Sequence, residues 1–207
     1  TEKFMEDYFQ KIQEALLKDM SLYDRLVSYE FPDMEPEEII EKMKSEAEKD
    51  FPKAPEAGYT VKHVHPSMQE NMSPAFYLTS PVDDIQNNFI YINDKYMDTD
   101  ESMGADLHPT LAHEGYPGHL YQNIYTASCN LPLIRNLLSY TGYTEGWATY
   151  VEMEYSYDYT GMDETLADLL SGDQAFSLAL SSYLDMKIHY DGWDKEDVGA
   201  FLSSLGI

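Results

Sequence analysis

Residues 110–125 read TLAHEGYPGHLYQNIY, and the centre of this stretch, residues 113–119, reads His-Glu-Gly-Tyr-Pro-Gly-His. The residues on both sides of the Pro-Gly pair have helical signals. Proline lacks a backbone donor and glycine adopts dihedral angles that other residues avoid, so Pro117 and Gly118 allow a kink or a bulge. We therefore expect a kinked helix at this point of the chain.

The kink matters because the two histidines of the stretch are six residues apart. In the zinc-binding pattern His-Glu-x-x-His the histidines are four apart, about 40° around a helix, so both rings face one ion. A six-residue spacing separates the rings by about 120° on an ideal helix. A kink is therefore needed to bring His113 and His119 to one ion, and the alternative interpretation is a turn that happens to hold two histidines.

A second segment favours the metal interpretation. Residues 143–150 read Tyr-Thr-Glu-Gly-Trp-Ala-Thr-Tyr and place Glu145 at the start of a helix. An isolated Glu in that position more often stabilises the helix dipole. Catalytic zinc, however, usually has three protein ligands, and two His with one Glu are a common set. We therefore expect one Zn²⁺ ion bound by His113, His119 and Glu145, with Glu114 nearby but not bound to it.

The charge balance limits the partners. Of the 207 residues, 38 are Asp or Glu and 13 are Lys or Arg, which gives a formal net charge of -25. This charge opposes binding to nucleic acid and to anionic membranes, and it favours cationic over anionic substrates at long range. A hydrophobic fraction of 43% predicts a packed core, and the sequence has no apolar run of about 18 residues to span a membrane. Cell-surface, secreted and cytoplasmic locations all stay open, and we expect the single Cys129 to be a small buried group.

Outside the motif, the sequence predicts a mainly helical α+β fold with one small sheet before the kinked helix. Short β-branched and aromatic runs predict the strands, and Pro36 starts a helix that reaches Asp50. We expect residues 1–57 to form N-terminal helices that pack on a core formed by residues 58–207. The strands are expected at residues 59–65, 75–79 and 88–93, and the other helices at residues 2–29 with a break near residues 19–21, 110–125, 132–140, 143–159, 163–190 and 194–204.

The strings LAHEGYPGHLYQ and PLIRNLLSYTGYTEGWATYVE resemble the bacterial domain of unknown function 885 family, whose hallmarks are His-Glu-x-x-Pro-Gly-His and a downstream Glu-Gly-Trp-Ala. Members are generally taken for zinc metallopeptidases of the gluzincin type or their relatives. The resemblance covers about residues 58–190. It implies a gluzincin-like fold, in which residues 58–207 form the catalytic domain. Because family chains are longer, it also implies that this chain is a C-terminal portion and that other parts of the same protein pack on it.

The resemblance implies a role for each residue of the motif. His113 and His119 correspond to the paired zinc ligands, Glu145 to the third ligand and Glu114 to the general base. Such a site hydrolyses peptide or small amide bonds, because zinc activates water while the carboxylate moves its proton. The alternatives are a metal- or peptide-binding module without turnover, and a polar core without a metal.

Several other side chains are candidates for supporting roles. An oxyanion donor could be the hydroxyl of Tyr77, Tyr116 or Tyr143, or a group of the pair His189-Tyr190. Glu152 lies seven residues after the proposed third ligand, on the same helix face, where it either orients a ligating histidine or faces solvent. Arg135 either forms an ion pair or binds a substrate carboxylate. The predicted strands offer an edge on which an extended peptide could pair.

Overall fold

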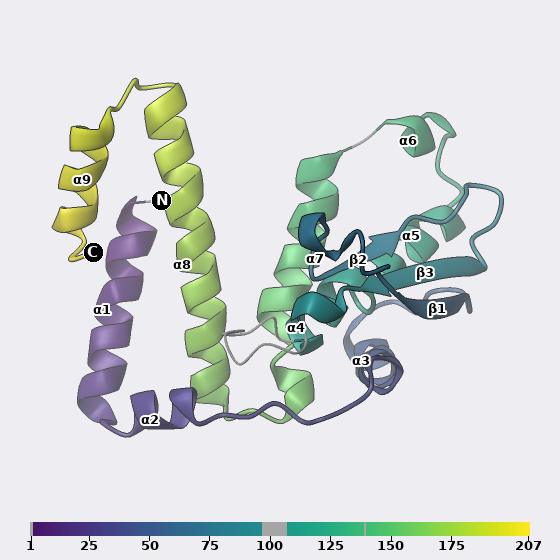
Figure 1. Ribbon diagram of the computed structural model, residues 1–207, viewed down its shortest axis with the longest axis horizontal. Helices are drawn as coiled ribbons and strands as arrows, with labels where there is room; N and C mark the ends of the chain where they lie inside the picture. The colour runs from purple at the N-terminus through teal and green to yellow at the C-terminus, as the bar shows by residue number, and fades with distance from the viewer. Residues whose placement is uncertain (1, 97–106, 139) are drawn as a thin grey trace. The chain divides into compact units, whose positions relative to one another are not determined.

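The computed structural model describes residues 2–96, 107–138 and 140–207, and the chain divides into two compact units. Unit 1 combines residues 1–30 with residues 163–207, and unit 2 comprises residues 31–162. Figure 1 shows that the described chain is mainly helical, with one small sheet. The predicted α+β class is therefore confirmed.

Unit 1 is built from helices near both ends of the chain. Its helices are α1 (Glu2–Lys18), α2 (Leu22–Val27), α8 (Glu164–His189) and α9 (Lys195–Ser204). Met5 of α1 packs with Phe176 and Tyr183 of α8 in a small hydrophobic core. The predicted break after the first helix is confirmed: the Asp19 carboxylate accepts hydrogen bonds from the Ser21 N–H (2.9 Å) and hydroxyl (2.7 Å) between α1 and α2.

Unit 2 contains a three-stranded mixed sheet. Strand β3 (Asn87–Ile92) lies in the middle, parallel to β1 (Gly58–His63) and antiparallel to β2 (Ala75–Leu78). Alternate residues of β3, Asn88, Ile90 and Ile92, are buried on one face, as the two-residue period of a strand requires. Strand β2 is an edge strand, so one side of its backbone is not paired within the sheet.

The helices of unit 2 are α3 (Pro36–Asp50), α4 (Leu107–Glu114), α5 (His119–Ser128), α6 (Ile134–Leu137) and α7 (Thr141–Tyr155). Helix α4 contacts α3, α5, α7 and strand β2. Its residues Leu111 and Ala112 are fully buried in the main core together with Leu120 and Ile124 of α5. Because α4 is surrounded on several sides, the residues at its C-terminal end are held by the core of the unit.

The structure divides the chain differently from the predicted boundary at residue 57. Helices α1 and α2 belong to unit 1 with residues 163–207, whereas α3 belongs to unit 2. The apolar faces explain the division: Met5 of α1 is buried against α8, whereas Ile39 and Ile40 of α3 lie in the core that contains α4. Local periodicity predicts these faces but does not identify their partners.

Two local expectations also need correction. The predicted kinked helix at residues 110–125 is two helices, because residues 115–118 leave the helical conformation entirely. Cys129 is exposed rather than buried. It is the C-cap residue directly after α5, and its thiol donates to the Tyr125 carbonyl at 3.3 Å.

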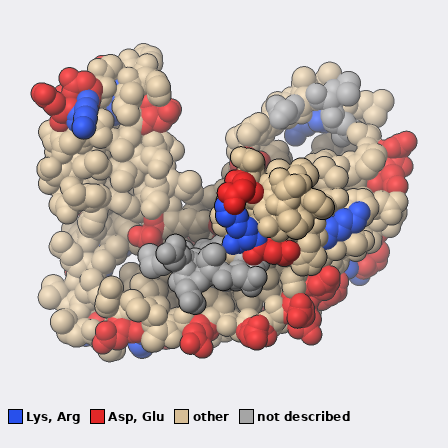
Figure 2. Space-filling view, viewed as in Figure 1, with Lys and Arg blue, Asp and Glu red and all other residues tan. Residues whose placement is uncertain are grey.

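The acidic composition appears on the surface. Figure 2 shows Asp and Glu side chains gathered over the region of α3, whose Glu37, Glu41 and Glu48 are exposed while Ile39 and Met43 are buried. This face repels polyanions, as the net charge predicts. Among the described helices, none is both long enough and apolar enough to cross a membrane.

Ile90 tests the assignment of the core. Its side chain is 0% exposed in the central strand, so Ile90→Ala should lower the free energy of unfolding by about 2–5 kcal/mol. Val82 of the same unit is 66% exposed, and Val82→Ala should change it by less than about 0.5 kcal/mol. Urea unfolding followed by circular dichroism measures both, and equal effects would contradict the assignment.

Candidate metal centre

The turn between α4 and α5 rests on a close backbone approach at Gly118. A Cβ atom at this position would overlap the carbonyl oxygens of Ala112 and His113, so no other residue type fits without movement of the backbone. The turn joins both helices through main-chain hydrogen bonds, from the Gly115 N–H to Leu111 (2.8 Å) and from the Gln122 N–H to the Gly118 carbonyl (2.9 Å). The chain thereby folds back over the end of α4, and α5 starts at His119.

This turn brings the two histidines together. The ring centroids of His113 and His119 are 4.7 Å apart and the rings are nearly perpendicular, at 87°. Glu145 reaches both of them from α7: its Oε2 atom lies 3.6 Å from His113 Nε2 and 3.5 Å from His119 Nε2. His113, Glu114 and His119 each offer a ligand atom, and these atoms lie within 4.8 Å of one another. We call these four residues the His-Glu cluster.

Glu152 holds His113 from the opposite side of its ring. Its Oε2 atom is 2.7 Å from His113 Nδ1, and it comes from α7, two turns after Glu145. This hydrogen bond leaves Nε2 as the ring nitrogen that faces Glu145. Both carboxylates lie on one face of α7, as the seven-residue spacing predicts.

Glu114 is held by the sheet. Its Oε2 atom accepts a 2.7 Å hydrogen bond from the main-chain N–H of Tyr77 in β2. The Tyr77 hydroxyl points elsewhere: it donates to Asn88 Oδ1 at 2.7 Å and accepts from Asn123 Nδ2 at 3.0 Å. The edge strand therefore contributes a backbone donor to the cluster. The Tyr77 hydroxyl does not, because it is hydrogen-bonded to the amide side chains of Asn88 and Asn123.

Burial and neighbouring charges shift the pKa values of the cluster. Burial raises the pKa of Glu114 above its ordinary value, although the Tyr77 N–H and His113 act in the opposite direction. Burial opposes protonation of His113, but the hydrogen bond and charge of Glu152, together with the charges of Glu114 and Glu145, outweigh it and raise the His113 pKa. Burial and the charge of His113 lower the pKa of His119. The environment thus favours a neutral His119 that can donate an electron pair.

Residues 34–205 match the model of a family described as bacterial protein of unknown function, DUF885. The chain belongs to this family. The DUF885 chain is also similar to a crystal structure from Colwellia psychrerythraea, which is described as a candidate lipoprotein, with a TM-score of 0.64 and 25% sequence identity. That match covers 88% of the DUF885 chain but 30% of the other chain. No curated protein matches the sequence.

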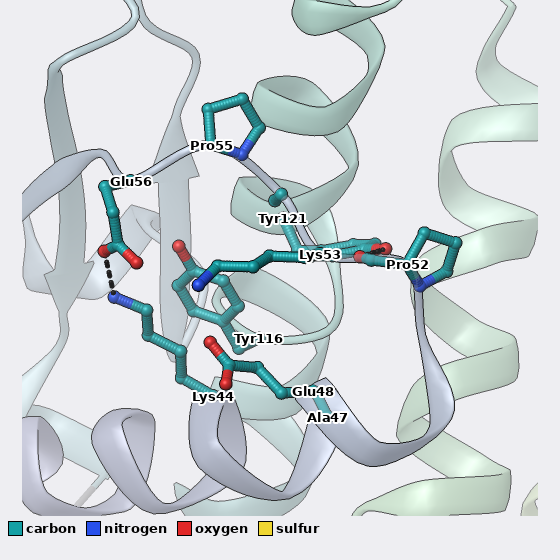
Figure 3. A pocket seen from close by; sticks show the side chains of 10 residues that line it. Lys44, Ala47, Glu48, Pro52, Lys53, Pro55, Glu56, Tyr116 and Tyr121 are labelled. Atoms are coloured by element: carbon teal, nitrogen blue, oxygen red, sulfur yellow. Dashed lines mark hydrogen bonds and ion pairs between the residues drawn. The ribbon is translucent and has the colours of Figure 1, made fainter.

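Tyr116 does not join the cluster in this DUF885 chain. It is 3% exposed and lines a pocket with Lys44, Glu56 and Tyr121, shown in Figure 3, where Lys44 forms an ion pair with Glu56. The volume open to the centre of a water molecule there is about 20 Å³, enough for about one water. None of the four cluster residues lines this pocket.

The remaining candidates lie on exposed parts of α6 and α7. Tyr143, in the first turn of α7, is 60% exposed. Arg135 of α6 is exposed and stacks its guanidinium over the Tyr140 ring at 4.8 Å. The sequence predicts either an ion pair or a substrate carboxylate as the partner of Arg135. It does not predict this cation–π contact with Tyr140.

Two contacts at the cluster were not predicted from the sequence. One is the Tyr77 main-chain N–H, which no sequence pattern marks as a donor. The other is Trp147, whose indole Nε1–H donates to the Pro117 carbonyl at 2.8 Å. The Glu-Gly-Trp-Ala motif was the available signal, because its Trp follows Glu145 by two residues.

Gly118 and Gly146 form a matched pair for testing the turn. Gly118→Ala should lower the free energy of unfolding by about 1–3 kcal/mol or more, because a Cβ overlaps two main-chain oxygens. Gly146 of α7 has nothing within 4 Å of an added Cβ, so Gly146→Ala should be neutral or stabilise by about 0.5–1 kcal/mol. Urea unfolding compares the two variants, and a harmless Gly118→Ala would refute the close approach.

Proposed function

We propose that this chain forms the catalytic site of a zinc-dependent hydrolase that acts on peptide or small amide bonds. The observation that carries the proposal is the convergence of two histidine Nε2 atoms on the Glu145 carboxylate, next to the carboxylate of Glu114. His113, His119 and Glu145 would hold the ion. A zinc ion bound there would supply Lewis-acid polarisation of the scissile carbonyl and activation of a water molecule.

The donor set fits zinc in type, and its two carboxylate–imidazole distances are close to those expected around the ion. Imidazole nitrogen and carboxylate oxygen are its usual partners, and two such atoms bound tetrahedrally to one ion lie about 3.3–3.5 Å apart. The two distances from Glu145 Oε2 to the histidines are 3.5 and 3.6 Å. The Glu152 carboxylate on Nδ1 of His113 is the kind of outer contact that fixes the ring orientation of a ligating histidine.

Glu114 is suited to move the proton. Its raised pKa brings it closer to the range in which a carboxylate accepts a proton from water and returns it to a leaving amine. The Tyr77 N–H holds one of its oxygens at 2.7 Å and so fixes the direction of the carboxylate.

The sheet edge favours a peptide as the substrate. Strand β2 lies at the edge of the sheet and contacts Glu114 through its own backbone. An extended peptide that paired with the edge beyond the Tyr77 N–H, which Glu114 occupies, would place its amide groups beside the cluster. Glu145 is 53% exposed at its side chain, so the cluster is accessible from solvent.

One observation favours the alternative, a metal- or peptide-binding module without turnover. Two of the tyrosines predicted as oxyanion donors are engaged elsewhere: the Tyr77 hydroxyl donates to Asn88, and Tyr116 lines a different pocket. Without these two hydroxyl groups, the developing negative charge of an amide hydrolysis has fewer stabilising donors beside the polarising ion.

Our proposal also includes other segments of the protein and its location in the cell. The chain spans 30% of its structural neighbour, so we propose that further segments of the same protein pack on it and help to enclose the substrate. The description of that neighbour as a lipoprotein favours a cell-surface location among those the composition leaves open.

Glu114→Gln separates binding from catalysis. Wild-type protein should bind one zinc per chain, and the full-length natural protein should hydrolyse members of a fluorogenic peptide library. Glu114→Gln should keep the zinc but lose about 100-fold or more in kcat/KM, because an amide cannot accept the proton. Metal content by emission spectroscopy and peptide kinetics give both values. Zinc binding without hydrolysis by the wild type would support the non-catalytic alternative, and no zinc binding would refute the site.

Glu152→Ala tests the outer carboxylate, with Glu154→Ala as its control on the same helix. Removing the Glu152 contact with His113 should weaken zinc binding about 10- to 100-fold. Glu154 is exposed, and its removal should leave the affinity unchanged. Competition with a chromophoric chelator measures both Kd values, and equal affinities for the two variants would show that Glu152 does not support the ligand.

A further inference from the structure

Because the two histidines are six residues apart, the chain between them must follow a defined path. The side chains of the His-Glu cluster do not themselves fix that path. Four residues must leave the helix between His113 and His119, and their path decides where His119 lies relative to the end of α4. Gly118 fits against α4 because it has no side chain. Its lack of a side chain permits the close approach. Main-chain hydrogen bonds join the turn to α4 and α5, and a contact with its middle, at Pro117, would fix its path further.

Trp147 supplies a contact of that kind. Its indole Nε1–H donates to the carbonyl of Pro117 at 2.8 Å, and Pro117 precedes the close-packed glycine. This is a side-chain hydrogen bond from α7 to the middle of the turn.

The indole ring is itself fixed. It packs edge-on against Phe51, with centroids 5.6 Å apart and planes at 78°, and stacks on Tyr121 of α5 at 6.3 Å and 20°. Aromatic rings in these arrangements stabilise one another beyond simple burial. Because Trp147 is held by neighbours in α5 and in the segment after α3, its N–H is directed at Pro117 rather than free to rotate away.

Helix α7 therefore contacts both the histidines of the cluster and the turn between them. Glu145 contacts the two histidines, and Trp147, two residues later, holds the turn that separates them. A shift of α7 would move the carboxylate and the turn together.

We propose that Trp147 is a positioning residue for the paired histidines: its hydrogen bond to Pro117 sets the turn so that His119 meets His113 at one ion. The proposal rests on the zinc site proposed above. It assigns to the Trp of the Glu-Gly-Trp-Ala segment a role distinct from ligation and from proton transfer.

The rival explanation is that Trp147 only fills space among Phe51 and Tyr121. The two explanations differ in what Trp147→Phe should do, because phenylalanine keeps an aromatic ring but lacks the N–H. Packing alone predicts unchanged zinc affinity. Positioning predicts that the affinity falls about tenfold or more, as it does when outer contacts of a metal site are removed.

The chain offers a matched control. Trp193 is the second of its two tryptophans and lies in unit 1 against Tyr183 and Phe201. Trp193→Phe should leave zinc affinity unchanged. Competition with a chromophoric chelator gives the zinc Kd of the wild type and both variants, and the Co²⁺-substituted proteins report the ligand arrangement through their visible absorption. For Trp147→Phe, an unchanged Kd and an unchanged Co²⁺ spectrum overturn the proposal.

A second measurement avoids the risk that Trp147→Phe fails to fold. In ¹⁵N-labelled Trp193→Phe protein, the single remaining indole N–H resonance belongs to Trp147. We expect its proton to exchange slowly with solvent and its resonance to shift when zinc is added. Fast exchange, or a resonance that zinc leaves unmoved, overturns the positioning role. If wild-type protein binds no zinc, the proposed function fails first, and that result is distinct from wild-type binding that survives in Trp147→Phe.

Discussion

The site depends on the contact between the backbone at Gly118 and the carbonyl oxygens that end α4. An unbroken helix would place the two histidines about 120° apart. The close approach lets the chain turn back onto the end of α4 within four residues, so that a second helix starts at His119. The 4.7 Å separation of the two imidazole rings follows from this turn, and α7 brings Glu145 to both of them.

Helix α7 organises the rest of the site through helical geometry. Glu145 and Glu152 are seven residues apart, about 20° from alignment on an ideal helix, so both face the histidines. Trp147 is two residues after Glu145 and therefore points about 160° away from it, towards the turn. A single rigid element thus delivers a carboxylate to Nε2 of His113, another to Nδ1 and a donor to Pro117.

Much of the local structure was predictable because it depends on residues close in sequence. Pro36 marks the start of α3, and the β-branched and aromatic runs mark the strands. The family motif and Glu145 were enough to predict which residues form the His-Glu cluster. The remainder depends on long-range packing, which periodicity does not encode.

Particular residues show where sequence reasoning ends. Helix α1 packs against α8, which lies more than 130 residues later in the sequence. No sequence pattern in either helix identifies the other as its packing partner. Tyr77 was chosen for its hydroxyl, but the structure uses its backbone N–H at Glu114, a group that every residue except proline has. Tyr116 belongs to the motif, yet its ring lies among residues of α3 and the segment after it because the turn directs it there.

The division of the chain bears on the order in which its parts form during synthesis. Unit 2 is one continuous stretch, whereas unit 1 joins residues 1–30 to residues 163–207, and Tyr8 donates to the carbonyl of Leu169 across 161 positions. A chain made from its N-terminus completes residues 31–162 before α8 exists. The apolar face around Met5 and Phe9 then lacks α8, the helix on which it packs in the structure, while residues 31–162 fold.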